Sequence, residues 1–158
     1  MLEEIVKLLS EYNLKLSCAE SCTGGMIAAK IVGVSGASKV FLGGFVTYTN
    51  EMKHKMISVS NDTLEKYTAV SRECAMEMAH GCANATGADI AVSVTGYAGP
   101  YDSPEEPKGL VYIGCAYKDV NYAKEFRFEG ERNEIREKAA NSAIELVREI
   151  LLNEYKGK

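Results

Sequence analysis

The sequence has few of the residues and segments that mark secreted, membrane or metal-binding proteins. Its two histidines and five cysteines form no C-x-x-C pair and no other spacing typical of a structural zinc site. No apolar run approaches the roughly 20 residues that span a bilayer. The first residues are charged and amphipathic, unlike a secretory signal. We therefore expect a cytoplasmic protein without a metal, in which the cysteines other than Cys22 are reduced and mostly buried.

An excess of basic residues is also absent. The chain has 18 Lys and Arg against 22 Asp and Glu, a net charge of −4, with no cluster of Lys or Arg. This balance argues against a nucleic-acid-binding surface. The 158 residues are enough to bury a core without disulfides, and the hydrophobic share of 46% is ordinary for a globular protein. We expect a single domain over residues 1–158, without internal repeats or linkers.

Apolar periodicity and turn residues predict helices and strands that alternate along the first part of the chain. Thr49 or Asn50, Ser60 or Asn61, and Ser71 are candidate helix caps. The three prolines all fall in one loop, 97–109. The order of elements predicts a three-layer α/β/α sandwich with a central mixed sheet. Helices are expected at 2–13, 23–36, 51–59, 62–68, 71–87 and 131–154, and strands at 14–20, 39–50, 88–96 and, as a hairpin, 110–130.

The stretch AESCTGG, residues 19–25, lies where a predicted strand gives way to a helix. Ligands of open α/β sheets bind at such strand ends, where a helix N-terminus offers unpaired N–H groups. Gly24 and Gly25 would let a ligand approach that backbone closely. The turn could hold a phosphate, or serve as an oxyanion hole beside Ser21 as nucleophile. Alternatively, Ser21 or Thr23 simply caps the helix.

A serine nucleophile needs a base, and neither histidine lies in an obvious turn motif, so a lysine is the alternative. Lys53 would lie in the first turn of the helix that Thr49 or Asn50 caps, where the helix dipole lowers the pKa of an amine. Tyr48, which ends the preceding strand, is its expected neighbour. Taken alone, Lys53 has the ordinary interpretation of a solvated surface lysine.

A third turn of this kind ends the strand at 88–96. Thr95 and Gly96 should therefore reach the same edge of the sheet as Ser21. Arg132 begins the last helix. It is a plain surface charge unless a phosphate lies nearby, in which case it would be a bidentate clamp.

The stretches AESCTGG, GFVTYTNEMK, AVS, TGYAGP and FEGERNEIR, in this order and over nearly the whole chain, resemble the CinA C-terminal domain family. The resemblance implies an α/β/α sandwich that self-associates as a homo-oligomer. For members that stand alone, it implies an amidohydrolase without cofactor that converts nicotinamide mononucleotide and water to nicotinate mononucleotide and ammonia.

The resemblance also implies residue roles, with Ser21 as the nucleophile, Lys53 as the base and Tyr48 as their partner. Other residues are expected to contact the substrate, but the sequence does not decide whether Thr95 and Gly96 or Arg132 hold its phosphate. The expected substrate contacts are Cys22, Thr23, Gly24, Gly25, Thr47, Asn50, Thr95, Gly96 and Arg132.

Other interpretations remain open at this point. The turns could bind a nucleotide without catalysis, or the enzyme could act on a different small amide, because the loop at 101–108 departs from the glycine-rich loop of the family. Cys22 could be the nucleophile, since a thiol at a helix N-terminus is often reactive. A role in binding another protein chain is a further alternative.

Overall fold

The structure is a computed structural model that describes residues 1–155. At its centre is a five-stranded sheet in the order β2-β1-β3-β4-β5. β1 pairs in parallel with β2 and β3, whereas the β3–β4 and β4–β5 pairs are antiparallel. The sheet is therefore mixed, as expected. Its strands are β1 (Leu16–Glu20), β2 (Phe41–Val46), β3 (Ile90–Gly96), β4 (Leu110–Tyr117) and β5 (Val120–Arg127).

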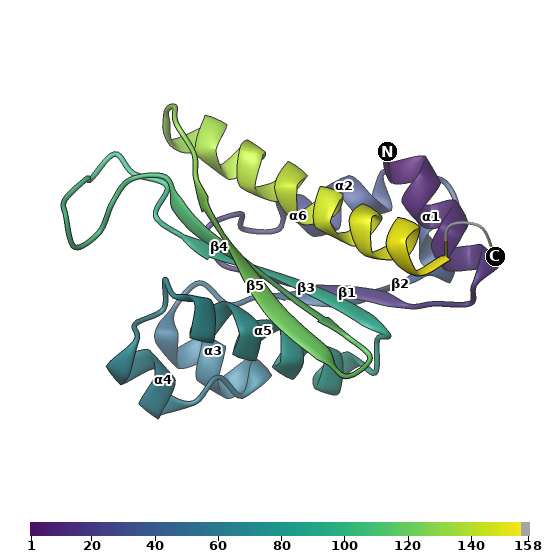
Figure 1. Ribbon diagram of the computed structural model, residues 1–158, viewed down its shortest axis with the longest axis horizontal. Coiled ribbons are helices and arrows are strands. Elements are labelled where there is room, and N and C mark those ends of the chain that lie inside the picture. Colours follow the sequence, from purple (N-terminus) through teal and green to yellow (C-terminus); the bar gives the residue numbers. More distant parts are fainter. Residues whose placement is uncertain (156–158) are drawn as a thin grey trace.

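Helices cover both faces of the sheet, which confirms the α/β/α sandwich (Figure 1). One layer holds α1 (Leu2–Glu11), α2 (Met26–Val32) and α6 (Arg132–Tyr155), and the other holds α3 (Asn50–Ile57), α4 (Asn61–Lys66) and α5 (Arg72–Thr86). A short 3₁₀ helix, η1 (Ala37–Lys39), precedes β2. Among the described residues, no helix is both long and apolar enough to cross a bilayer.

The core lies on both sides of the two central strands. Every residue of β1 is buried, and so are the first six residues of β3, because helices pack on both faces of these strands. The larger apolar cluster lies under α1, α2 and α6, and a smaller one lies under α5. All five cysteines are buried and free, which the sequence predicted for the four other than Cys22.

Parallel pairing places the carboxyl ends of β1, β2 and β3 along one edge of the sheet. These strands end at Glu20, Val46 and Gly96, so the three turns expected to carry chemistry follow side by side. The proline-containing loop 97–109 extends beyond the same edge, at the left of Figure 1. The fold thus gathers residues from distant parts of the sequence at one place.

Three predicted helix caps are confirmed. Thr49, Ser60 and Ser71 are N-caps whose hydroxyl oxygens accept hydrogen bonds from backbone N–H groups. The helix expected from residue 23 begins only at Met26, because Gly24 and Gly25 have φ angles of 58° and 107° that do not fit a right-handed helix. The pairing of β1 with β2 is irregular at one point, where Leu16 pairs with Phe41 and Ser17 with Gly43.

Candidate active site

Ser21 and Lys53 meet at the edge of the sheet. Ser21 directly follows β1, and Lys53 lies one turn into α3, which begins after β2. The Lys53 Nζ and the Ser21 Oγ are 3.0 Å apart. The same Nζ donates to the carbonyl oxygen of Thr47 at 2.8 Å. The hydroxyl and the amine are therefore close enough to exchange a proton, although 32 residues separate them in the chain.

Lys53 is a buried amine, not a solvated one. Its side chain is packed into the molecule, with 1% of the residue exposed. Within the described residues no carboxylate forms an ion pair with it, and burial lowers its pKa from the usual range of lysine. The sequence predicted this direction from the helix dipole, but the structure assigns it to the loss of solvation. A neutral amine is the form that can accept a proton.

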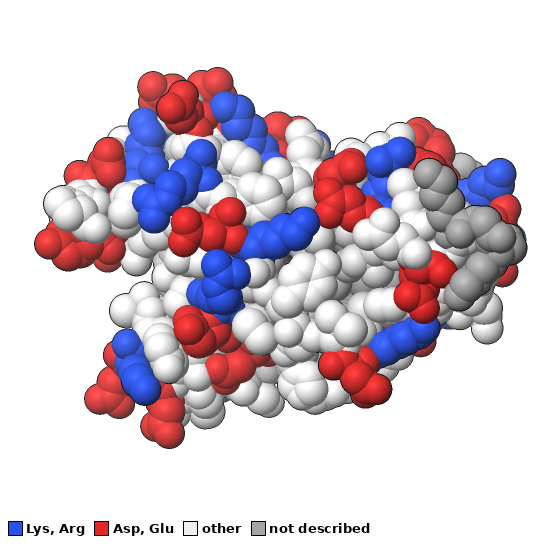
Figure 2. All heavy atoms as spheres, in the orientation of Figure 1, with Lys and Arg blue, Asp and Glu red and all other residues white. Residues whose placement is uncertain are grey.

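A cavity of about 440 Å³ opens in front of this pair. It lies between the loop 97–109 on one side and the start of α3 on the other, and Figure 2 shows the hollow at the left of the molecule. The aromatic rings of Tyr48, Tyr97 and Tyr101 contribute to its wall. Basic and acidic side chains are interspersed over this face of the molecule, without a broad area of one sign.

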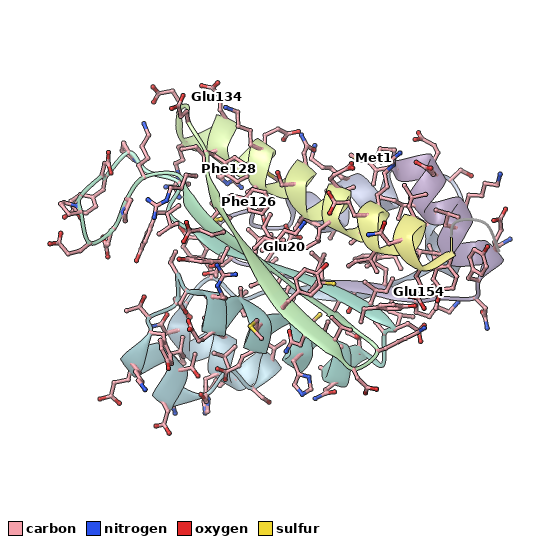
Figure 3. The ribbon with its side chains drawn as sticks, in the orientation of Figure 1. Met1, Glu20, Phe126, Phe128, Glu134 and Glu154 are labelled. Atoms are coloured by element: carbon pink, nitrogen blue, oxygen red, sulfur yellow. The ribbon has the colours of Figure 1, made fainter. Side chains whose placement is uncertain are left out.

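The N-terminus of α2 is already occupied by a side chain of the protein. The carboxylate of Glu20 accepts hydrogen bonds from the backbone N–H groups of Ile27 at 2.9 Å and Ala28 at 3.1 Å. It also accepts one from the Thr23 hydroxyl at 2.6 Å. Glu20 is 1% exposed and lies inside the molecule, between the sheet and the helices above it (Figure 3).

Two of the roles considered for this helix N-terminus, binding a phosphate and being capped by Ser21 or Thr23, are therefore not supported. These two N–H groups are not free for a substrate phosphate, and neither Ser21 nor Thr23 is the N-cap of α2, which is Gly25. Sequence reasoning missed Glu20, because it lies at the end of β1, well before the first residue of α2, Met26.

Cys22 does not have the properties of an activated thiol. Its side chain is buried, and this burial raises the pKa of Cys22 to about 11, because a thiolate would be poorly solvated there. The raised pKa argues against the alternative in which Cys22 is the nucleophile.

Tyr48 and Arg132 form the outer part of the site. Tyr48 is 60% exposed, and its hydroxyl accepts a hydrogen bond from Nη2 of Arg132 at 3.3 Å. Nη1 of Arg132 donates to the carbonyl oxygen of Gly99. Tyr48 was expected beside Lys53, but among the described residues its hydroxyl bonds neither Lys53 nor Ser21. It is placed instead to hold Arg132 at the mouth of the cavity.

The structure brings some of the expected contact residues together and leaves others outside. Thr95 lies at the cavity, but its hydroxyl donates to the carbonyl oxygen of Ala69 at 2.8 Å. Thr47 is buried, and its hydroxyl has no partner within the described residues. Sequence reasoning missed Tyr97, Tyr101 and Glu106. The cavity is lined by Cys22, Asn50, Thr95, Gly96 and Arg132 of the expected set, whereas Thr23, Gly24, Gly25 and Thr47 do not line it.

Comparison with known proteins gives a consistent family assignment. The CinA C-terminal domain matches residues 1–151. A CinA-like protein from Kosmotoga olearia is 50% identical over 153 residues, which is 96% of this chain and 37% of that protein. A putative competence-damage inducible protein from Caldicellulosiruptor saccharolyticus is 49% identical, with the same two shares. The chain thus spans a little over a third of the length of the curated relatives it matches.

Solved structures of similar length share the fold over nearly the whole chain. A competence/damage inducible protein from Agrobacterium tumefaciens is 40% identical with a TM-score of 0.87, covering 96% of this chain and 95% of that one. A competence-damaged protein (CinA) superfamily protein from Klebsiella pneumoniae is 30% identical with a TM-score of 0.92, covering 96% of both chains. The chain belongs to the CinA C-terminal domain family.

Proposed function

We propose that the protein is an amidohydrolase in which Ser21 is the nucleophile and Lys53 the base. The observation that carries this proposal is the 3.0 Å distance between the Ser21 Oγ and a buried lysine amine whose pKa is lowered. A neutral Lys53 can donate one hydrogen to the Thr47 carbonyl and direct its lone pair at the Ser21 hydroxyl. This is the arrangement that activates a serine without histidine.

The reaction then follows in two halves. Lys53 accepts the Ser21 proton as the oxygen attacks the carboxamide carbon, which gives a tetrahedral oxyanion. Lys53 returns that proton to the leaving nitrogen, the C–N bond breaks, and ammonia departs from an ester on Ser21. A water molecule attacks the ester while Lys53 accepts its proton. The C–O bond to Ser21 breaks, and the proton passes to the Ser21 oxygen, which restores the enzyme.

The backbone after Ser21 has a candidate donor for the oxyanion. Cys22 lines the cavity, and within residues 1–155 its N–H donates to no backbone carbonyl oxygen, whereas the N–H of Ser21 donates to the Val94 carbonyl oxygen. N–H groups next to a nucleophile stabilise the charge that develops on the attacked carbonyl oxygen. We assign the oxyanion hole to the N–H of Cys22.

We propose nicotinamide mononucleotide as the substrate, which would place the protein in the recycling of pyridine nucleotides. The family resemblance implies it, and the cavity is consistent with it. Tyr97 and Tyr101 line the cavity and offer aromatic rings for a planar ring, and the lining residue Arg132 offers a guanidinium for a phosphate. The catalytic pair lies at the inner end, where the carboxamide would have to reach.

Ammonia release from nicotinamide mononucleotide tests this proposal. The wild type should release ammonia with formation of nicotinate mononucleotide, and Ser21→Ala and Lys53→Met should each lower kcat by at least about 1,000-fold. Lys55→Met and Ser38→Ala, at exposed positions, are the matched controls and should keep the wild-type rate. In the wild type, kcat/KM should rise with pH through an apparent pKa below the usual value of about 10.4 for lysine.

Two results would overturn the mechanism. Full activity of Ser21→Ala would exclude the serine nucleophile, and a rate independent of pH from 5 to 9 would exclude the lysine base. Cys22→Ala should retain activity within about threefold, because the thiol has no part in the steps above. Loss of activity in Cys22→Ala, with activity kept in Ser21→Ala, would move the nucleophile to Cys22.

One feature favours a second candidate function, hydrolysis of a small amide that lacks a phosphate. Glu106 lines the cavity together with Arg132, and a carboxylate there would oppose a phosphate dianion. A panel of amides with and without phosphate separates the two candidates. Ammonia release from the phosphate-free amides alone would favour the second.

We further propose that the chain acts in the cytoplasm as a homo-oligomer, as the family resemblance implies. Sedimentation velocity at micromolar concentration tests the assembly. A single species with the mass of one chain would contradict it.

A further inference from the structure

Two side chains of opposite charge line the cavity without pairing with each other. Glu106 comes from the loop 97–109, and Arg132 is the first residue of α6. The guanidinium of Arg132 donates to two neutral oxygens, the Gly99 carbonyl and the Tyr48 hydroxyl. Among residues 1–155, no ion pair includes Glu106 or Arg132, and the Glu106 carboxylate accepts no hydrogen bond. Both charges are therefore available to groups of a ligand.

The loop that carries Glu106 is closed by its own hydrogen bonds. The Glu106 N–H donates to the Ser103 hydroxyl oxygen at 3.0 Å, and the Ser103 N–H donates to the Glu106 carbonyl oxygen at 3.2 Å. The Lys108 N–H donates to the Asp102 carboxylate at 2.9 Å. Of the three acidic residues of the loop, Asp102 and Glu105 do not line the cavity. Glu106 is therefore the carboxylate that this loop presents to a ligand.

The Glu106 carboxylate lies near the aromatic wall of the cavity. Burial raises the pKa of the Tyr97 hydroxyl, and the negative charge of Glu106 raises it further. Tyr101 lines the same cavity. A carboxylate attracts a cation through its charge, and an aromatic face attracts one through its quadrupole. This part of the cavity thus suits a flat ring that carries a positive charge.

The remaining charges of the cavity do not oppose such a ring. Of the described residues that line it, only Lys53, Glu106 and Arg132 have side chains that can carry a full charge near neutral pH. Burial lowers the pKa of Lys53, which favours the uncharged amine. With Lys53 neutral, the cavity has one negative and one positive side chain. A ligand with one cationic and one anionic group matches this pair.

We propose that Glu106 is a specificity-determining residue that selects amides carried on a positively charged ring, the pyridinium carboxamides. The proposal rests on the proposed amidohydrolase function and extends it. In nicotinamide mononucleotide the carboxamide is attached to a pyridinium ring, and the phosphate is the anion. Glu106 attracts the ring while Arg132 binds the phosphate. A phosphate-free pyridinium amide gains the same attraction to Glu106, whereas an amide on a neutral ring does not.

Binding of a matched pair of nucleosides to Ser21→Ala tests this selection without turnover. Nicotinamide riboside and its reduced, dihydro form share the ribose and the carboxamide, but only the first has a charged ring. Ser21→Ala should bind the charged form about tenfold more tightly, and added salt should reduce the difference. Adding Glu106→Gln should remove most of this preference and change the Kd of the reduced form by less than about twofold. Adding Glu105→Gln, at an exposed position outside the cavity, should keep the preference.

Steady-state kinetics with nicotinamide mononucleotide give a second readout. Glu106→Gln, with Ser21 in place, should raise KM about tenfold and change kcat by less than about threefold. The reason is that the ring keeps its charge throughout the reaction, so Glu106 stabilises the bound substrate and the transition state alike. Glu105→Gln should leave both constants at their wild-type values.

Three results would overturn the selection by Glu106. They are equal affinities for the two nucleosides, an unchanged preference in Glu106→Gln, and no binding of either nucleoside up to about 10 mM. A wild type that releases ammonia from no amide would refute the proposed function instead. The affinities for the two nucleosides would still decide whether Glu106 recognises a cationic ring.

Discussion

Lys53 is the largest of the fully buried side chains among the described residues. Taking an amine out of water without a carboxylate partner is costly, and a protein usually avoids it by leaving the amine uncharged. Its two hydrogen-bond partners, the Ser21 hydroxyl and the Thr47 carbonyl, are both neutral. This arrangement sacrifices stability at a site where an uncharged amine is useful, which is typical of catalytic residues.

The lowered pKa of Lys53 should make folding stability depend on pH. Between the pKa of the folded state and that of the unfolded state, about 10.4, the unfolded chain binds a proton that the folded chain does not. The wild type should therefore gain stability relative to Lys53→Met as the pH rises through this window, by up to about 1.4 kcal/mol for each pH unit. Urea unfolding of both proteins between pH 6 and 10 measures the difference.

The hydrogen bonds that Lys53→Met loses add an offset, so only the change with pH is diagnostic. Lys55→Met is the control, because Lys55 is exposed and pairs with Glu51 at the surface. Its difference from the wild type should stay nearly flat over the same pH range. A flat difference for Lys53→Met as well would mean that the pKa of Lys53 is not lowered in the folded state.

The helix pair α3 and α5 positions Lys53 through a close backbone contact. Gly81 in α5 lies against the Ile57 carbonyl at the end of α3, and a Cβ at residue 81 would overlap that oxygen. Gly81→Ala should therefore push the helices apart and lower the free energy of unfolding by at least about 2 kcal/mol. Because α3 carries Lys53, activity should fall as well. Urea unfolding and the ammonia assay measure the two effects.

Asn84→Ala is the comparison for this element. Asn84 is exposed on the same helix, one turn further on, and among residues 1–155 its side chain bonds only His80. Its replacement should change the stability by no more than about 0.5 kcal/mol. Equal stability of Gly81→Ala and Asn84→Ala would show that α3 can shift without cost.

Some features of the helices could be predicted from neighbouring residues in the sequence, and others could not. The caps Thr49, Ser60 and Ser71 could be predicted because a cap depends only on residues within one turn. The hydrogen bonds of Glu20 to the N-terminus of α2 could not be predicted, because they depend on how β1 and α2 pack against each other in the fold. Gly81 appears in the sequence as a glycine inside a helix, and its reason is a neighbour 24 residues away in the numbering.

At the scale of the molecule, alternating helices and strands predicted the mixed sheet and the edge where three strand ends meet. The pairing of Ser21 with Lys53 followed from that edge together with the family resemblance. Other contacts of the site depend on the tertiary fold. Arg136 meets Cys22 from 114 residues away, and Arg132 meets Tyr48 from 84 residues away. No local sequence pattern predicts such contacts, because α6 packs against the sheet only in the complete fold.

Because the proposed catalytic residue Ser21 and the proposed phosphate ligand Arg132 are different side chains, substrate binding can be measured apart from turnover. In Ser21→Ala, nicotinamide mononucleotide at about 100 times its Kd should stabilise the fold by about 2.7 kcal/mol, which raises Tm by roughly 5–10 °C. Nicotinamide riboside, which lacks the phosphate, should give a smaller shift at equal concentration, because Arg132 has no anion to bind. Adding Arg132→Ala should make the two shifts equal, whereas adding Arg127→Ala, an exposed arginine of β5 away from the cavity, should leave them unequal. Equal shifts while Arg132 is still present would mean that the site does not recognise the phosphate, and would favour the phosphate-free amide as substrate.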